Sequence, residues 1–177
     1  MGADLLFYGI VIVVILVFAT AAIAGVKAAP YVPTFQRDVR RMLRVAEVKP
    51  GELVVDLGAG DGRFLITAVR EFGARAVGYE LSLLPYLVAK LRVRLAGLGR
   101  QIQIFYRDFY QVDLSPADVV TCFLTPRAMT KLEPKFTAEL NSGRRVVSYA
   151  FKLPTIEPLS VDKPHPRATP IFLYRFG

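Results

Sequence analysis

A short glycine-rich stretch is the part of this sequence whose residue types and spacing most clearly suggest chemistry. Leu53–Leu57 reads as a short buried strand, and it runs directly into Gly58-Ala59-Gly60-Asp61-Gly62-Arg63. Glycine is needed where the backbone turns sharply and approaches a ligand closely, because a Cβ atom would collide there. The pattern therefore predicts a ligand-binding loop between a strand and a helix.

The spacing of the glycines separates two classes of ligand. Dinucleotide enzymes use G-x-G-x-x-G, whose third glycine falls at the position that Arg63 occupies here. The observed pattern is G-x-G-x-G, and Asp56 stands two residues before it. A carboxylate at the end of the first strand suits a cationic ligand, and the large cationic side chain after the last glycine does not by itself indicate a pyrophosphate site.

Two further acids stand where the next strands should end. Glu80 follows the strand predicted at 76–79, and an acid at this place can accept hydrogen bonds from both ribose hydroxyls. Asp108 follows the strand predicted at 102–106 and precedes Phe109, which suits an adenine site in which the carboxylate accepts from the exocyclic amine. A solvated acid at a strand end is the alternative for Asp108.

The elements that must position these residues alternate between strand and helix. Helices are predicted at 62–72 and 84–98, and later strands at 118–124, 144–151 and 170–176. This order predicts an α/β fold with a doubly wound, Rossmann-like sheet. The stretch between the last two strands contains four prolines, so we expect no helix there, and the sheet is minimal, ending in a strand pair.

An uncharged segment precedes this domain. Residues 5–26 carry no charge, and a helix of that length spans roughly 33 Å, enough to cross a bilayer. Small residues at 19–24 also allow a cleaved signal peptide, but the first basic residues follow the segment instead of preceding it. We expect a transmembrane anchor at 1–28, contacting membrane lipid through 5–26, and a cytoplasmic domain at 29–177.

A proline-containing linker follows the anchor. Pro30 and Pro33 should prevent the membrane helix from continuing and should separate the anchor from the domain. Thr34 is predicted to be the N-cap of an amphipathic helix at 35–47. The apolar face of that helix should contain Val39, Met42, Leu43 and Ala46.

Composition excludes several classes of protein. The 177 residues suffice for one compact domain, and a single cysteine, Cys122, and a single histidine, His165, exclude a disulfide scaffold and a Cys/His metal site. The formal charge of +8 arises from basic residues that all lie at or after Lys27. Such a charge favours anionic partners, which include phospholipid headgroups, RNA and acidic protein surfaces.

The chain resembles the class I S-adenosylmethionine-dependent methyltransferases through residues 54–62, Glu80 and Asp108. The resemblance implies that S-adenosylmethionine is the cofactor, that the glycine loop lies near its methionine part, that Glu80 holds the ribose and that Asp108 holds the adenine. The cofactor-binding residues expected on this basis are Thr34, Asp56, Gly58, Ala59, Gly60, Gly62, Glu80, Asp108 and Phe109.

Flanking motifs narrow the resemblance to the small protein-lysine methyltransferases. These motifs are residues 30–34, 61–63, 107–109, 117–121 and 145–148. The family includes archaeal broad-specificity enzymes and mitochondrial enzymes that methylate the ATP synthase c-subunit and the adenine nucleotide translocase. The likeness extends from Pro30 onward and implies transfer of methyl groups to lysine ε-amino groups of protein substrates, with membrane-associated substrates expected because of the anchor.

Two residues are candidates for catalysis. Thr125 ends the fourth strand, where many class I enzymes receive the substrate nitrogen, whereas family members often carry a tyrosine near the position of Phe123. Tyr149, in the fifth strand, could shape a lysine channel or could be a core aromatic. No histidine base is expected, so proximity and alignment should supply most of the rate.

Two other functions remain open. One is a methyltransferase acting on lipid headgroups or RNA, which the basic domain and the anchor would also allow. RNA would require aromatic residues interleaved with a basic patch, and nucleic acid is not our expected partner. The other is a non-catalytic cofactor-binding membrane protein, which the set of Asp56, Glu80 and Asp108 disfavours.

Overall fold

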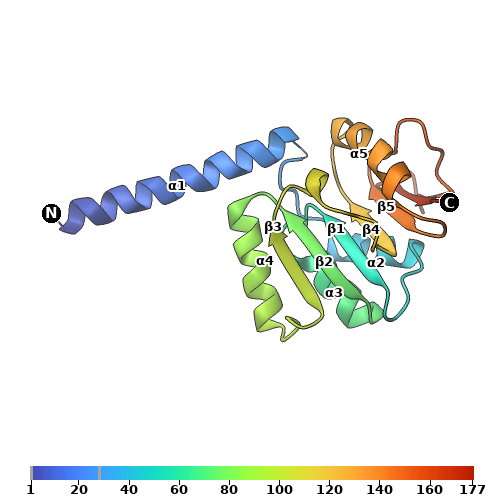
Figure 1. The fold of residues 1–177 in the computed structure, drawn as a ribbon, viewed down its shortest axis with the longest axis horizontal. Coiled ribbons are helices and arrows are strands. Elements are labelled where there is room, and N and C mark those ends of the chain that lie inside the picture. Colours follow the sequence, from blue (N-terminus) through green and yellow to red (C-terminus); the bar gives the residue numbers. More distant parts are fainter. Residues whose placement is uncertain (1, 28) are drawn as a thin grey trace.

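A computed structural model describes residues 2–27 and 29–177 and contains the elements shown in Figure 1. In chain order these are α1 (Gly2–Lys27), α2 (Gln36–Val45), β1 (Leu53–Leu57), α3 (Arg63–Phe72), β2 (Arg75–Glu80), α4 (Leu83–Leu95), β3 (Ile102–Tyr106), the 3-10 helix η1 (Phe109–Gln111), β4 (Val119–Cys122), α5 (Pro126–Glu139), β5 (Arg145–Tyr149), β6 (Ser160–Asp162) and β7 (Ile171–Arg175).

The strands form one seven-stranded sheet in the order β3-β2-β1-β4-β5-β7-β6. The strands from β3 to β5 in this order are parallel, and β7 is antiparallel to both β5 and β6. The order reverses next to β1, and in an open α/β sheet ligands bind at such a reversal, beyond the carboxyl ends of the strands. The predicted α/β class is confirmed.

Helices cover both faces of the sheet because the side chains of each strand alternate between them. Val55 and Leu57 of β1 belong to the same buried cluster as Met129 and Leu132 of α5. Val54, next to Val55 in the chain, packs in a second cluster with residues of α2 and α3. Residues of α3 and α4 form a third cluster with β2 and β3. The parallel strands are therefore apolar on both sides, as their unbroken hydrophobic runs require.

The helix after the linker differs from its prediction at one end. Val39, Met42, Leu43 and Ala46 are buried, as expected from their spacing. The N-cap position is Phe35, without a side-chain cap, so the prediction that Thr34 caps the helix is wrong. The carbonyl oxygen of Thr34 instead accepts a hydrogen bond from Arg63 Nη1 at 2.7 Å, which ties the linker to the glycine loop.

The segment between β5 and β7 contains little regular secondary structure, as its prolines predicted. No helix occurs in residues 150–170, all of which the structure describes. The short strand β6, which periodicity did not reveal, pairs with β7 over Ser160–Asp162. The sheet therefore ends in an antiparallel pair.

Helix α1 extends away from the domain, and its last turns contact it (Figure 1). Thr20 Oγ1 accepts a hydrogen bond from the backbone N–H of Leu83 at 3.2 Å, Ala24 is buried, and Lys27 Nζ lies 2.7 Å from Asp108 Oδ2. The linker prolines thus do not separate the helix from the domain as expected. The expected domain boundary at residue 28 lies outside the described residues. By length and composition α1 could cross a membrane, although a signal sequence would also fit.

Gly78 in β2 lies where α3 and the glycine loop pack most closely on the sheet. A Cβ atom there would stand 2.5 Å from Leu65 Cδ1 and 2.7 Å from Ala59 Cβ. We expect Gly78→Ala to lower the free energy of unfolding by about 1–3 kcal/mol, the usual effect of overpacking. Denaturant unfolding of the full chain in detergent measures this. Gly99→Ala is the matched control, because nothing lies within 4 Å of its added Cβ, and an equal loss in both variants would contradict the packing argument.

Candidate functional site

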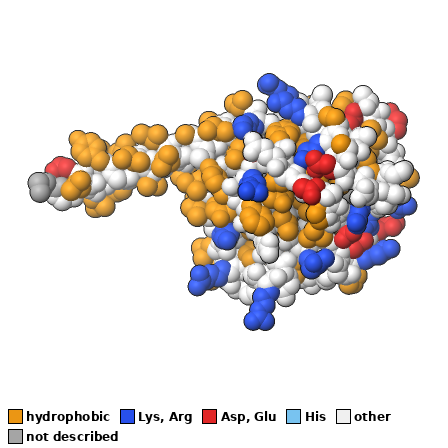
Figure 2. Space-filling view, in the orientation of Figure 1, with side chains coloured by type: hydrophobic (Ala, Val, Ile, Leu, Met, Phe, Trp, Pro, Cys, Tyr) orange, Lys and Arg blue, Asp and Glu red, His pale blue; other side chains and the backbone are white. Residues whose placement is uncertain are grey.

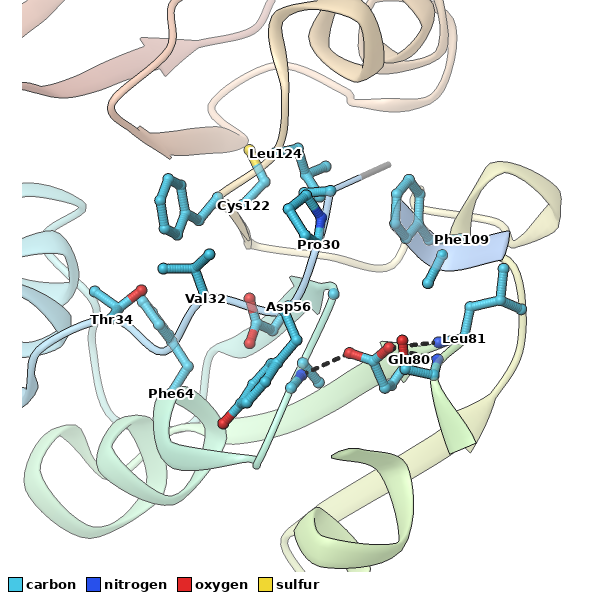
Figure 3. A pocket seen from close by; sticks show the side chains of 18 of the residues that line it. Pro30, Val32, Thr34, Asp56, Phe64, Glu80, Leu81, Phe109, Cys122 and Leu124 are labelled. Atoms are coloured by element: carbon cyan, nitrogen blue, oxygen red, sulfur yellow. Dashed lines mark hydrogen bonds between the residues drawn. The ribbon is translucent and has the colours of Figure 1, made fainter. Parts of the chain in front are cut away.

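A pocket opens beyond the carboxyl ends of β1, β2 and β4, where the linker after α1 lies over the sheet (Figure 3). Most of the cofactor-binding residues expected from the sequence line it. These are Thr34, Asp56, Gly58, Ala59, Gly60, Glu80, Asp108 and Phe109. Residues far apart in the chain are thus brought to one place by the parallel sheet.

The glycine loop has the backbone geometry that its composition predicted. Gly58 and Gly60 both have positive φ angles, 85° and 54°, which residues with a Cβ rarely adopt. Gly60 also allows a close approach, because a Cβ atom there would lie 2.8 Å from Cε2 of Tyr31. The linker aromatic therefore rests on the glycine loop and forms one wall of the pocket.

Gly62 is not among the residues that line the pocket. It precedes α3 with a positive φ angle, and an added Cβ would lie 3.2 Å from Ala89 Cβ in α4. The absence of a side chain at Gly62 thus permits α4 to pack closely against the start of α3. Its expected place in the cofactor site has no support in this geometry.

Glu80 is held in the pocket by backbone hydrogen bonds. Its Oε2 accepts from the backbone N–H of Gly60 at 2.8 Å, and its Oε1 accepts from those of Leu81 and Ser82 at 2.8 and 2.7 Å (Figure 3). A carboxylate offers about four acceptor positions, so about one is left for a ligand. Because the side chain is buried, these bonds fix both the carboxylate and the loop that it holds.

Asp56 at the end of β1 is buried, and its Oδ1 accepts a hydrogen bond from Thr121 Oγ1 at 2.8 Å. Burial raises the pKa of Asp56 to about 7, against the opposing effect of the Thr121 hydrogen bond, and the nearby charges of Glu80 and Asp61 add to the increase. A cationic group of a ligand in the pocket would favour the ionised form. Asp56 can therefore bind such a group and release a proton in doing so.

Asp108 is paired with the end of α1. Its Oδ2 lies 2.7 Å from Lys27 Nζ, and its Oδ1 accepts from the backbone N–H of Tyr110 at 3.1 Å. The Tyr110 hydroxyl donates to the carbonyl oxygen of Lys27 at 3.1 Å. Asp108 is therefore not the solvated acid considered as the alternative. The contribution of Lys27 was not foreseen, although it is the first basic residue after the apolar run.

Charged side chains around Asp61 hold the glycine loop in place. Arg63 donates from Nε to Asp61 Oδ1 at 2.9 Å and from Nη2 to Oδ2 at 2.7 Å, and Arg92 of α4 also donates to Asp61. Burial opposes ionisation of Asp61, but the hydrogen bonds and charge of Arg63 outweigh it and lower its pKa. Arg63, which occupies the place of a dinucleotide loop's third glycine, thus joins the loop to the linker and Asp61.

The two candidate catalytic residues lie behind the pocket wall. Thr125 Oγ1 accepts from the backbone N–H of Ala128 at 3.4 Å and so caps α5. The Tyr149 hydroxyl donates to Asp38 Oδ2 at 3.0 Å, and its ring packs edge-to-face on Phe123 with centroids 4.9 Å apart. Neither residue lines the pocket, whereas Phe123 does. Of these three residues only Phe123 faces the pocket.

Residues 2–27 and 29–177 contain no cluster of three or more His, Cys, Asp and Glu side chains that could hold a metal ion. The pocket instead combines buried carboxylates, a glycine-rich backbone and apolar side chains such as Phe109 and Leu124. Carboxylates accept hydrogen bonds from hydroxyls and amines and attract cations, and an aromatic ring can pack on a flat heterocycle. These groups fit a cationic adenosyl cofactor.

Comparison with known proteins points to the same cofactor. The family model described as "ANTKMT methyltransferase domain" matches residues 56–160. A solved structure of an RNA methyltransferase from Salinibacter ruber in complex with S-adenosyl-L-homocysteine superposes with a TM-score of 0.78 at 33% identity, covering 81% of this chain and 93% of that one. The fold is thus that of an S-adenosylmethionine-dependent methyltransferase.

Two curated relatives narrow the comparison. The chain is 41% identical over 135 residues to a protein-lysine N-methyltransferase from Saccharolobus islandicus, covering 76% of this chain and 84% of the relative. It is also 41% identical over 135 residues to the adenine nucleotide translocase lysine N-methyltransferase of Mus musculus, of which it spans 57%. With the family model matching more than half of the sequence, the chain belongs to the family of S-adenosylmethionine-dependent protein-lysine methyltransferases.

Proposed function

We propose that this chain is a membrane-anchored protein-lysine N-methyltransferase that transfers methyl groups from S-adenosylmethionine to lysine ε-amino groups. The observation that carries the proposal is the 41% identity to the Saccharolobus enzyme, which extends over 84% of that relative. A more distant relative adds support, since it is the lysine N-methyltransferase of the ATP synthase c-subunit in Xenopus laevis, 36% identical over 131 residues.

The chain's own residues would hold the cofactor in three places. Glu80, fixed by three backbone N–H groups, has an acceptor position for a ribose hydroxyl. Asp108 and Phe109 would receive the adenine, and Asp56 would face the positive charge of the methionine part. Bound there, the cofactor supplies an electrophilic methyl group on a sulfonium. Thr34, Gly58 and Ala59 complete the proposed site as lining residues.

The substrate nitrogen must lose a proton before it can attack. A lysine ammonium has a pKa near 10.4 in water, and an apolar environment lowers it because the charged form is desolvated. Val32, Phe123 and Leu124 give the pocket such an environment. No histidine lines it, so we assign the chain's catalytic contribution to desolvating the amine and aligning it with the methyl group.

The charge distribution and the length of α1 support its proposed role as a membrane anchor. Residues 5–26 of α1 carry no charge, most of the helix is uncovered by the domain, and the basic residues follow it. By the positive-inside rule this places the catalytic domain, residues 29–177, on the cytoplasmic side. The anchor would hold the pocket near lysines of membrane-associated proteins and raise their effective concentration.

Glu80→Ala should weaken binding of S-adenosylmethionine by about 1.5–3 kcal/mol, because a hydrogen bond to a charged group is lost. Isothermal calorimetry on the full chain measures the change. Glu80→Gln separates the effects of charge and shape, and Glu157→Ala, at an exposed loop position, is the control. Unchanged affinity in Glu80→Ala would show that this residue does not bind the cofactor.

Binding of the cofactor should strengthen as the pH rises through 7. Asp56 has a raised pKa of about 7, so below that pH a proton must leave before the carboxylate can meet a cation. If the bound state keeps Asp56 ionised, affinity should be about tenfold lower at pH 6 than at pH 8. The same titration with neutral methylthioadenosine is the control. In Asp56→Asn this part of the pH dependence should disappear, and its persistence would assign the titration to another group.

The substrate class is tested with methyl-labelled cofactor and a membrane extract. We expect label in protein, recovered after hydrolysis as methylated lysine, because the Saccharolobus relative is a protein-lysine methyltransferase. The similar Salinibacter structure is that of an RNA methyltransferase, so RNA is the second arm of the experiment, and lipid is the third. Label found mainly in RNA or lipid would reject the proposed substrate.

A chain lacking residues 2–19 tests what the anchor contributes. This deletion keeps Thr20, Ala24 and Lys27, which contact the domain. We expect it to methylate soluble proteins as well as the full chain does, while losing the preference for integral membrane proteins in a reconstituted mixture. Mass spectrometry of the labelled lysines compares the two enzymes, and identical substrate profiles would show that α1 does not direct substrate choice.

A further inference from the structure

Helix α4 carries apolar side chains on two opposite faces, and the rest of the structure covers only one of them. Ala89 and Val93 are buried against the sheet. Residues on the other side recur every three or four positions and so form one continuous band, which we call the α4 stripe. Its members, with their exposed fractions, are Leu84 (53%), Leu87 (52%), Val88 (38%), Leu91 (56%) and Leu95 (77%).

Such a band indicates a missing partner. A helix that is apolar all round is ordinarily buried on every side, whereas a surface helix alternates an apolar face with a polar one. Five neighbouring large side chains also exceed the scattered exposed leucines that any protein surface shows. Figure 2 shows hydrophobic side chains continuing from α1 onto the adjoining surface of the domain.

The charges around the α4 stripe select the kind of partner. No acidic residue occurs between Glu80 and Asp108, a segment that holds five basic ones. Lys90, Arg94 and Arg100 from this segment are exposed, and their side chains make no ion pair or hydrogen bond with any described residue. They line a groove between α4 and β3 beside Leu91. An apolar band bordered by unpaired basic side chains is typical of a helix lying in the interface of an anionic membrane.

The position of α4 relative to α1 supports the same partner. The backbone N–H of Leu83 donates to Thr20 Oγ1, so α4 begins beside the last turns of α1. In Figure 1, α4 runs across the direction of α1, next to the place where α1 meets the domain. A membrane plane through which α1 passes would therefore lie along α4.

The depth of this contact completes the argument. The uncharged run of α1 continues for six residues beyond Thr20, to Val26. Those residues correspond to about 9 Å of helix, so in a membrane matched to the run Thr20 lies below the surface. The start of α4 lies at the same level, because Leu83 contacts Thr20. Interfacial helices are buried by roughly this depth.

We propose that the α4 stripe lies in the interface of the bilayer that α1 spans, with Lys90, Arg94 and Arg100 at the level of anionic headgroups. The inference rests on the membrane-spanning α1 proposed above. It gives the enzyme two membrane contacts in different directions, a spanning helix and a helix lying in the surface. Two such contacts fix the orientation of the catalytic domain, which a single flexible tether would not.

The test uses the full chain with one environment-sensitive fluorophore per variant. Leu91→Cys labels the α4 stripe, Ala138→Cys labels an exposed position on α5 as the aqueous control, and Leu16→Cys labels α1. Cys122 is buried, and the unsubstituted chain is the labelling blank. Each variant is reconstituted with excess lipid into vesicles of phosphatidylcholine and phosphatidylglycerol. Binding of S-adenosylmethionine verifies that each labelled variant is folded.

We expect nitroxide-bearing lipids to quench most of the fluorescence at positions 91 and 16 and little at 138, and iodide to quench only at 138. Replacing phosphatidylglycerol with phosphatidylcholine should reduce quenching by the nitroxide-bearing lipids at position 91, since the basic side chains then lose their anionic headgroup partners. If iodide quenches the label at position 91 while nitroxide-bearing lipids quench the label at position 16, the α4 stripe lies in water. That result would overturn the inference and leave the proposed anchor intact.

Two other results are distinguishable. A label at 91 that neither quencher reaches would assign the α4 stripe to a second copy of the chain and overturn the inference. Absence of lipid quenching at 16 would reject the anchor, and with it the membrane-spanning premise, whatever the result at 91.

Discussion

The Glu80 carboxylate is the constraint on which the site depends. It joins the end of β2 to the glycine loop after β1, accepting from Gly60 on one side and from Leu81 and Ser82 on the other. A buried carboxylate without such donors would be costly, and backbone N–H groups without an acceptor would be costly as well. Each therefore requires the other. The loop, the pocket floor and the proposed ribose contact follow from this mutual requirement.

The end of α1 is part of the pocket as well as the start of the proposed anchor. Lys27 pairs with Asp108, Ala24 is buried at the pocket, and Tyr31 of the linker lies against Gly60. An acid expected to receive the adenine is thus bound to the last residue of the apolar helix. The position of α1 and the shape of the cofactor site are therefore physically connected, so the proposed anchor and the proposed cofactor site share residues.

Helix α4 has one face packed against the domain and an opposite face that is exposed. Ala89 packs closely on Gly62, where an added Cβ would lie 3.2 Å from Ala89 Cβ, and Arg92 donates to Asp61 of the glycine loop. The opposite face carries the α4 stripe and makes no such contacts with the described part of the domain. An exposed second apolar face is unfavourable for a helix in water. It becomes favourable where that face meets lipid.

The sequence by itself determined those features of the fold and the site that depend on the residue pattern within one element or turn. The bounds of β1 and β3, the glycine turn, and the acids at the strand ends follow from alternation, glycine spacing and the geometry of a parallel sheet. The α/β class follows from the same order of elements, and the cofactor from the motifs that carry the family resemblance.

Only the tertiary structure decided contacts between residues far apart in the chain. Lys27 meets Asp108 across 81 positions, Thr34 binds Arg63 instead of capping α2, Gly62 faces α4, and Tyr149 lies behind Phe123 bound to Asp38. Periodicity states which side of an element is apolar. It does not state which element crosses that side or at what height, because the packing of the whole chain sets that geometry.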